Sequence, residues 1–217
     1  MPTQLIADMG SCHCGKLAYA EEMLELCAPS KIWVKFQLCS AEGKNLPLDR
    51  SWLRFLVDKG KKLGIQVFCS IWKPEDIKTL TDAGCEYVKF AYTARNACAM
   101  HRAALAEGLQ VIVTHDPMET IEEIKNVQRL WTVMSCPDQP AYPVTFSINH
   151  IGMAHRWDGF SCHSYDAQEV KRAVDAGYKL VEFHAKLPGQ TGDAPDFRFA
   201  INIAEVISFS QMNHGGR

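Results

Sequence analysis

Short apolar runs alternate along the chain with longer segments in which apolar residues recur every three or four positions. Short runs rich in β-branched and aromatic residues predict strands, and the longer period predicts amphipathic helices. The predicted strands are Gln4–Met9, Lys31–Leu38, Gln66–Trp72, Tyr87–Ala91, Gln110–Thr114, Leu130–Cys136, Gly159–His163 and Lys179–Ala185. The predicted helices are Lys16–Ala28, Arg50–Leu63, Pro74–Ala83, Asn96–Glu107, Met118–Val127, Asp166–Ala176 and Phe197–Gln211, with one short helix near Ser147–His155.

The regular alternation of strands and helices indicates the fold class. Eight strand–helix repeats without an intervening linker predict an α/β protein, a (β/α)8 TIM barrel in a single compact domain. The 217 residues of the chain are close to the lower size limit of that fold. The alternative is an open doubly wound sheet, but no glycine-rich phosphate-binding sequence opens a predicted helix.

Polar residues at the ends of the predicted strands are the candidates for function, because barrel active sites lie where the strands end. Alternation along each strand selects the residues that point into the barrel. These candidates are Asp8, Lys35, Gln37, Lys89, Thr114 or His115, Ser161, His163, Glu182 and His184, with His13 in the loop after the first strand.

The segment Gly159–Ala185 contains a complete strand–helix–strand unit whose two strands end in His163 and His184. A crossover through a helix makes the strands parallel, and neighbouring strands lie about 4.8 Å apart. Two imidazoles at matched positions are therefore within reach of one metal ion. The alternative is that each histidine is a hydrogen-bonded structural residue, which is the usual role of a single histidine at a strand end.

Two lysines, Lys35 and Lys89, are predicted to point into the barrel. A buried ammonium group without a partner is costly, so each needs an anion. One interpretation is that Asp8 and Glu182 supply that anion as a structural pairing. The other is a binding site for a small substrate that carries carboxylate or phosphate groups.

Composition excludes several partners. The net charge is −2 and there is no long basic run, so we expect no nucleic-acid and no membrane partner. No apolar run approaches the ~20 residues that span a bilayer, and the first residues do not resemble a secretory signal. The nine cysteines favour free thiols in a reducing compartment, hence a cytoplasmic protein. Thiolate-bound zinc at Cys12–Cys14 and Cys162 is disfavoured, because adjacent strand residues point to opposite faces.

Several motifs occur in the order seen in a known family. They are IADMGSCHCGKL (Ile6–Leu17), VKFQ (Val34–Gln37), YVKFA (Tyr87–Ala91), GFSCHS (Gly159–Ser164), VEFHA (Val181–Ala185) and GDAPDF (Gly192–Phe197). Together they resemble the sialic acid synthases (N-acetylneuraminate synthase, or NeuB-like, proteins). The resemblance implies a cytoplasmic transferase that condenses phosphoenolpyruvate with a sugar aldehyde to form a 2-keto sugar acid.

The resemblance also implies roles for individual residues. His163 and His184 would be ligands of a divalent metal, with Mn²⁺ favoured and Mg²⁺ or Zn²⁺ as alternatives. Asp196 would hold a metal-bound water, and Asp8 would lie near the reacting sugar. Contacts to phosphoenolpyruvate would come from Lys35, Lys89 and Ser161, and Gln37 and His13 are further substrate-binding candidates.

Other positions depart from the family's pattern and keep two alternatives open. Ile71, Tyr92 and Asp138 stand where phosphate-binding residues are usual, which favours a divalent-metal-dependent aldolase, lyase or isomerase that does not use phosphoenolpyruvate. The third alternative is a non-catalytic binding barrel. The sequence ends after the predicted barrel, so we expect the family's C-terminal antifreeze-like domain to be absent. Because that domain contributes to the family's dimer, a homodimer is left open.

Overall fold

Parallel strands form a closed barrel in the computed structural model, which describes residues 2–41, 46–115, 124–132 and 157–212. The barrel strands are β1 Gln4–Asp8, β2 Trp33–Leu38, β3 Val67–Ile71, β4 Tyr87–Phe90, β5 Gln110–His115, β6 Val127–Trp131, β7 Gly159–Cys162 and β8 Leu180–Lys186. Each pairs in parallel with the next, and β8 pairs with β1 to close the sheet. The predicted (β/α)8 barrel is confirmed.

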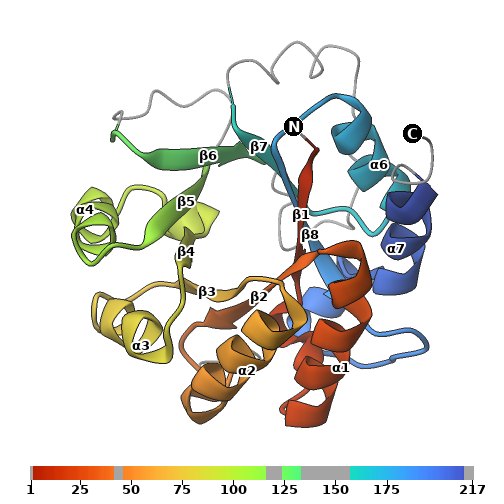
Figure 1. Cartoon of the computed structure of the whole chain (residues 1–217), viewed down its shortest axis with the longest axis horizontal. Coiled ribbons are helices and arrows are strands. Elements are labelled where there is room, and N and C mark those ends of the chain that lie inside the picture. The colour runs from red at the N-terminus through yellow and green to blue at the C-terminus, as the bar shows by residue number, and fades with distance from the viewer. Residues whose placement is uncertain (1, 42–45, 116–123, 133–156, 213–217) are drawn as a thin grey trace.

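Helices surround the strands (Figure 1). In the described residues they are α1 Leu17–Cys27, α2 Arg50–Leu63, α3 Glu75–Ala83, α4 Cys98–Ala106, α6 Ala167–Asp175 and α7 Ile203–Met212. The sequence determines the ends of α2 locally: Asp49 accepts a hydrogen bond from the backbone N–H of Ser51, and Gly64 ends the helix in the left-handed conformation. No helix in the described part of the chain is long and apolar enough to cross a membrane.

The barrel interior is divided into an apolar and a polar layer. Near the amino ends of the strands, Ile6, Phe68, Ile112, Leu130 and Leu180 form a separate buried cluster, against which Trp33 and Tyr87 pack. Two residues further along these strands, the inward positions become polar, including Asp8, Lys35, Ser70, Lys89, Thr114 and Glu182. The outward residues pack with the helices in one larger core. Apolar packing thus closes one end of the barrel, and the polar groups gather at the carboxyl ends of the strands.

The predicted boundary between the fifth helix and the sixth strand is wrong. The sixth strand was predicted as Leu130–Cys136, but β6 begins at Val127, which pairs with Val111 of β5. Val127, which was predicted as the last residue of a helix, therefore belongs to the sheet. Residues 116–123, 133–136 and the short helix near Ser147–His155 lie outside the described residues.

The closing helix was predicted as Phe197–Gln211 and instead begins at Ile203. The preceding residues form a 3₁₀ turn, η5 (Pro195–Arg198), and a two-residue strand, β9 (Ile201–Asn202), which pairs with β8. The side chain of Asn202 accepts a hydrogen bond from the N–H of Ala204. An asparagine in this position starts a helix at the next residue, and that is the physical reason for the later boundary.

Candidate functional site

A cavity of about 200 Å³ lies at the carboxyl ends of the strands. Among its lining residues are ten of the candidates named from the sequence: Asp8, Lys35, Gln37, Lys89, Thr114, Ser161, His163, Glu182, His184 and Asp196. Asp8 and His184 meet because β1 and β8 pair in the register that sets these two residues side by side. The closed barrel therefore brings together polar groups from both ends of the chain.

A group of four buried charges forms the floor of the cavity, and we call Asp8, Lys35, Lys89 and Glu182 the charge quartet. The Nζ of Lys35 lies 2.6 Å from Oδ2 of Asp8 and 3.8 Å from Oε2 of Glu182. The Nζ of Lys89 donates to both carboxylate oxygens of Glu182, at 2.7 and 2.8 Å. These side chains are at most 5% exposed, so the charges are held by one another rather than by solvent.

Hydroxyl groups complete the hydrogen bonding of the charge quartet. Lys35 also donates to Oγ of Ser70 at 2.8 Å, and Ser161 donates to Oε1 of Glu182 at 2.8 Å. Ser161 therefore contacts a carboxylate in this structure, and it reaches the two lysines only through Glu182. An ammonium group has three hydrogens. Lys35 uses two of them on Asp8 and Ser70, which leaves one for a further acceptor.

Opposite charges in the quartet determine its protonation. Burial alone would raise the pKa of Glu182, but Lys35 and Lys89 outweigh it and hold that pKa below the usual range. Burial likewise opposes the charge of Lys35, whose pKa is nevertheless raised by Asp8 and Glu182. For Lys89, burial and the repulsion of Lys35 prevail over Glu182 and lower the pKa. The structural pairing of both lysines with carboxylates, left open by the sequence, is present.

The two histidines lie above this floor, side by side. The ring centroids of His163 and His184 are 5.0 Å apart, and each is 5.9 Å from the ring of Phe199. Burial, and then the neighbouring His184, lowers the pKa of His163 to about 3. His163 is therefore neutral at physiological pH, which is the form that binds metal ions.

The hydroxyl group of Thr132 determines the tautomer of His163. It donates its hydrogen to the backbone carbonyl of Ser161 at 2.8 Å and lies 3.0 Å from Nδ1 of His163. A hydroxyl has one hydrogen to give, so toward Nδ1 it acts as an acceptor. Nδ1 thus carries the proton, and Nε2 presents a lone pair. This arrangement, in which the second ring nitrogen is held by a neighbour, is usual for metal-ligating histidines.

His184 faces two carboxylates at a separation that suits a shared cation. Its Nδ1 is buried and has no hydrogen-bond partner among the described residues; it lies 3.5 Å from Oδ1 of Asp196 and 3.7 Å from Oδ2 of Asp8. These separations are too long for good hydrogen bonds. Two ligands each about 2.1 Å from one ion are separated by roughly 3.0–3.5 Å for angles of about 90–110°. An imidazole nitrogen and a carboxylate oxygen therefore fit a divalent ion between them.

The protein groups present would form only part of a coordination shell. Across the described residues, no set of three or more His, Cys, Asp and Glu side chains is already arranged around a metal position. The donor set of two imidazoles and one carboxylate oxygen suits Mn²⁺, Mg²⁺ or Zn²⁺ with water or substrate at the remaining positions. A zinc site built on thiolates is not favoured, because burial raises the pKa of Cys12 and raises that of Cys162 to about 12.

Asp196 enters the cavity from the turn η5 and is held by the loop after β1. Its Oδ2 accepts hydrogen bonds from the backbone N–H and the hydroxyl of Ser11, at 2.7 and 2.6 Å. Burial alone would raise the pKa of Asp196, but His184 and the bonds from Ser11 lower it. Sequence reasoning missed Ser11 and Thr132. Ser11 lies inside the first family motif, whereas Thr132 was obscured by the misplaced sixth strand.

His13, the remaining candidate, does not line this cavity. It is buried in a separate pocket of about 480 Å³ with Leu48, Arg50 and Trp52. Its Nδ1 accepts a hydrogen bond from the N–H of Gly15 at 3.1 Å, and its ring lies edge-on to Trp52 with centroids 6.3 Å apart. Burial lowers the pKa of His13, so its imidazole is neutral. Its role in substrate binding stays a prediction.

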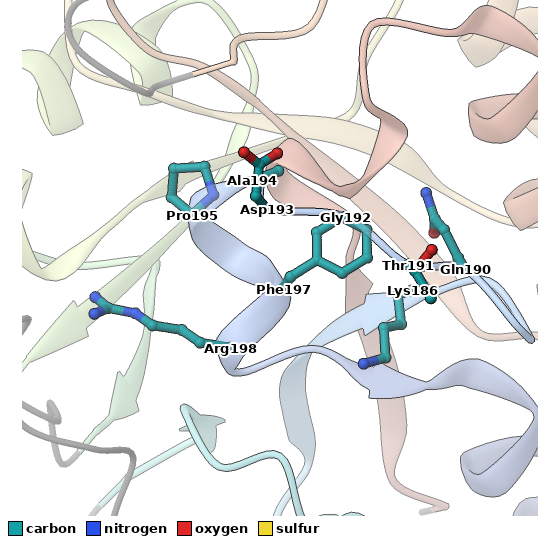
Figure 2. Close-up of a pocket in the computed structure, with 9 residues that line it drawn as sticks. All are labelled: Lys186, Gln190, Thr191, Gly192, Asp193, Ala194, Pro195, Phe197 and Arg198. Atoms are coloured by element: carbon teal, nitrogen blue, oxygen red, sulfur yellow. The ribbon is translucent and has the colours of Figure 1, made fainter.

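The loop that follows β8 also lines a larger pocket of about 740 Å³ (Figure 2). The ring of Phe197 lies in the middle of this view, and the Nζ of Lys186 is 5.8 Å from its centroid. None of the candidate residues named above lines this pocket. It shares the turn η5 with the cavity, because Asp196 of the same turn faces the histidines.

Comparisons with known proteins identify the family and the fold. The family model described as NeuB family matches residues 36–214. Among solved structures, the N-acetylneuraminic acid (sialic acid) synthetase of Leptospira borgpetersenii serovar Hardjo-bovis in complex with citrate is 19% identical with a TM-score of 0.74, covering 100% of this chain and 87% of that one. The spore coat polysaccharide biosynthesis protein SpsE of Bacillus subtilis is 20% identical with a TM-score of 0.75, covering 99% and 68%.

A third solved structure extends the likeness of fold. The DAHP synthase (phospho-2-dehydro-3-deoxyheptonate aldolase) of Thermotoga maritima is 10% identical with a TM-score of 0.77, covering 98% of this chain and 69% of that one. At these identities the solved structures show a common fold. No curated protein sequence matches the chain.

Proposed function

Because the chain belongs to the NeuB family, we propose that it is a metal-dependent synthase that condenses phosphoenolpyruvate with a sugar aldehyde to form a 2-keto sugar acid. The observation that carries the proposal is the charge quartet directly beneath the histidine pair. Buried lysines beside a two-imidazole site provide one place for an anionic donor and, next to it, one for a cation.

The charge of the cavity supports the need for a divalent ion. Among the described lining residues, three carboxylates (Asp8, Glu182 and Asp196) stand against two ammonium groups (Lys35 and Lys89), which leaves a charge of −1 before the imidazoles are counted. Phosphoenolpyruvate carries about three negative charges at neutral pH. A divalent ion held by His163 and His184, with Asp196 beside it to hold a metal-bound water, would change the local charge to +1 and make binding favourable.

Polarisation of the aldehyde carbonyl and activation of water are what such an ion supplies when bound. The residues of the chain would do the rest by position and charge. The remaining hydrogens of Lys35 and Lys89 would bind the donor's acidic groups and hold its C3 against the aldehyde carbon. The C3–aldehyde carbon bond would form as the carbonyl double bond opens, water would add at C2, and the C2–O bond to phosphate would break to leave a keto group. One proton of the water would go to the former aldehyde oxygen and the other would leave with the phosphate. Asp8, next to Lys35 and 3.7 Å from His184, would orient the aldehyde end.

The test is phosphate release from phosphoenolpyruvate with a panel of sugar aldehydes in the presence of Mn²⁺. We expect release that depends on both an aldehyde and the metal, and that falls at least 100-fold in Lys89→Met, because the donor loses a charge-assisted contact. Lys171→Met is the matched control, since Lys171 pairs only with Asp175 on the surface of α6. No phosphate release with any aldehyde would rule out the synthase.

One observation favours a second candidate. On the β3–β4 side the cavity is lined by the rings of Trp72 and Tyr92 and by Thr93, whose hydroxyl accepts a hydrogen bond from the indole N–H of Trp72 at 2.8 Å. Aromatic rings thus occupy much of the side where we would expect phosphate-binding groups. Ile71 points away into the outer core, and Asp138 lies outside the described residues. A metal-dependent aldolase, lyase or isomerase would use the same histidines without phosphoenolpyruvate. Metal binding without phosphate release supports this candidate, and the absence of both supports a non-catalytic barrel.

The proposal also covers the compartment, the substrates and the oligomeric state of the protein. The cysteines in the described residues are free thiols, which fits a reducing compartment and hence the cytoplasm. The substrates we propose are small molecules. A homodimer stays a prediction from the family resemblance.

A further inference from the structure

We infer that Ser11 is a positioning residue for Asp196: its hydroxyl group orients the carboxylate so that one oxygen is fully hydrogen-bonded and the other faces His184. The inference goes beyond the family resemblance, which gives Ser11 no role. It rests on the proposed function only in the assumption that Asp196 serves a metal site.

Ser11 and Asp196 bind each other reciprocally across the closed barrel. The hydroxyl of Ser11 donates to Oδ2 of Asp196 at 2.6 Å and accepts from the backbone N–H of Asp196 at 3.1 Å. The backbone N–H of Ser11 adds a bond of 2.7 Å to the same Oδ2. Three hydrogen bonds thus join the turn η1 (Gly10–His13), after β1, to the turn η5, and two of them use the hydroxyl.

As a consequence, the two carboxylate oxygens of Asp196 have different neighbours. Oδ2 receives two donors from Ser11, whereas Oδ1 lies 3.5 Å from Nδ1 of His184. Without the hydroxyl, the plane of the carboxylate could turn so that neither oxygen faces His184. Because the side chain of Asp196 is 16% exposed, it is not held in place by burial alone. The hydroxyl therefore selects the orientation in which Oδ1 is presented to the histidine.

The absence of a side chain at Gly10 leaves room for the carboxylate of Asp196. It has a φ of +47°, and a Cβ placed on it would come within 2.4 Å of Oδ2 and 2.8 Å of Cγ of Asp196. Such distances exclude any side chain at position 10 unless Asp196 moves. Gly10 thus leaves space for the carboxylate that Ser11 holds, and both residues determine the position of Asp196.

A purely structural role is the competing explanation, since the same bonds tie two loops together. The two explanations differ in what the hydroxyl controls. If Ser11 only stabilises the loops, its removal lowers stability and leaves metal affinity unchanged. If it orients Asp196, its removal weakens metal binding through that residue.

The experiment measures Mn²⁺ affinity by calorimetry without any substrate. In Ser11→Ala we expect affinity to fall about 10- to 100-fold, the range for loss of a group that orients a metal ligand, and Ser11→Thr to restore most of it. Ser208→Ala is the matched control, because that hydroxyl bonds only to a carbonyl within α7. In an Asp196→Asn background, Ser11→Ala should cause no further loss.

The outcomes separate this inference from the proposed function. The inference is overturned if Ser11→Ala leaves Mn²⁺ affinity unchanged. It is also overturned if Ser11→Ala lowers the affinity as much in the Asp196→Asn background as in the wild type. Neither result bears on the proposed synthase activity. If the wild-type protein binds no Mn²⁺, the metal part of the proposed function fails, and crystal structures of the two Ser11 variants decide the inference. We expect the Asp196 carboxylate to rotate in Ser11→Ala and to keep its place in Ser11→Thr. A carboxylate that stays in place in Ser11→Ala refutes it.

Discussion

At the scale of single residues, one hydroxyl group determines which nitrogen of His163 faces the cavity. Thr132 donates to the carbonyl of Ser161 and accepts from Nδ1 of His163. In Thr132→Val the ring loses its acceptor at almost constant volume. We expect Mn²⁺ affinity to fall about 10-fold or more, and nitrogen NMR of His163 to show a mixture of tautomers in the metal-free protein.

Two variants serve as controls for this prediction: one retains a hydroxyl at position 132, and the other makes the same Thr→Val change elsewhere. Thr132→Ser retains the acceptor and should keep a single tautomer with protonated Nδ1. Thr81→Val makes the same change where the hydroxyl bonds only to the carbonyl of Lys78 on an exposed helix. A single tautomer and undiminished metal affinity in Thr132→Val would contradict the role given to this residue.

Strand alternation was sufficient to predict which residues point into the barrel. Lys35, Lys89 and Glu182 all lie on the inward face, as expected from a period of two. The sequence named Asp8 and Glu182 as possible partners of the lysines but left a substrate anion as the alternative, because ion pairing depends on distances across the barrel that the sequence does not encode locally. The same limit explains His13, which was grouped with the site by its motif and lies in another pocket.

At the scale of elements, the bounds of α2 were predicted correctly, whereas the start of α7 and the ends that depend on sheet pairing were not. The prediction for α2 matches its observed bounds, because Asp49 and Gly64 mark its ends in the sequence. The start of β6 and the short strand β9 depend on pairing with β5 and β8. Such pairing is a tertiary interaction that overrides local periodicity.

Strand β7 approaches its neighbours closely, and Gly159 makes this approach possible. A Cβ at this position would lie 2.2 Å from the carbonyl oxygen of Leu180 and 2.5 Å from Cδ2 of Leu130. Because the nearest atom is backbone of β8, relief requires movement of a strand that carries Glu182 and His184. We expect Gly159→Ala to lower the free energy of unfolding by about 2–3 kcal/mol, as measured by urea denaturation.

Gly192→Ala is the control for that prediction. Its added Cβ would meet only ring atoms of Phe197 at 3.0 Å, and this ring is partly exposed and has room to move. We expect a change within about 0.5 kcal/mol. Equal stabilities of the two variants would show that the close approach of β7 and β8 is not required.

At the scale of the whole molecule, closure of the barrel creates the site. The hydrogen bonds of Glu182 reach Lys89 on β4 and Ser161 on β7, and Lys35 on β2 joins this group to Asp8 on β1. The charge quartet therefore links strands that are far apart in sequence. Motif order predicted that these groups belong to one site, whereas the pairing of β1 with β8 fixes which of them touch.

This linkage makes the stability of the barrel sensitive to acid. The lysines lower the pKa of Glu182 in the folded protein, so its contribution is fully present above the unfolded value of about 4.3. The contribution is lost progressively as pH falls below that value toward the lower folded pKa. Burial of neutral His163 adds to acid sensitivity, but it does so in the wild type and in a Glu182 variant alike.

Glu182→Gln isolates the contribution of the charge quartet. At pH 7 we expect the variant to be less stable by about 3 kcal/mol, because two buried ammonium groups lose their shared carboxylate. Urea denaturation from pH 7 to pH 3 should show the difference from wild type shrinking below about pH 4.3. Asp175→Asn, which removes a surface pair with Lys171, is the control and should show little change at any pH. A difference for Glu182→Gln that stayed constant down to pH 3 would mean that its carboxylate is not held ionised by the lysines, and the electrostatic account of the cavity floor would have to be abandoned.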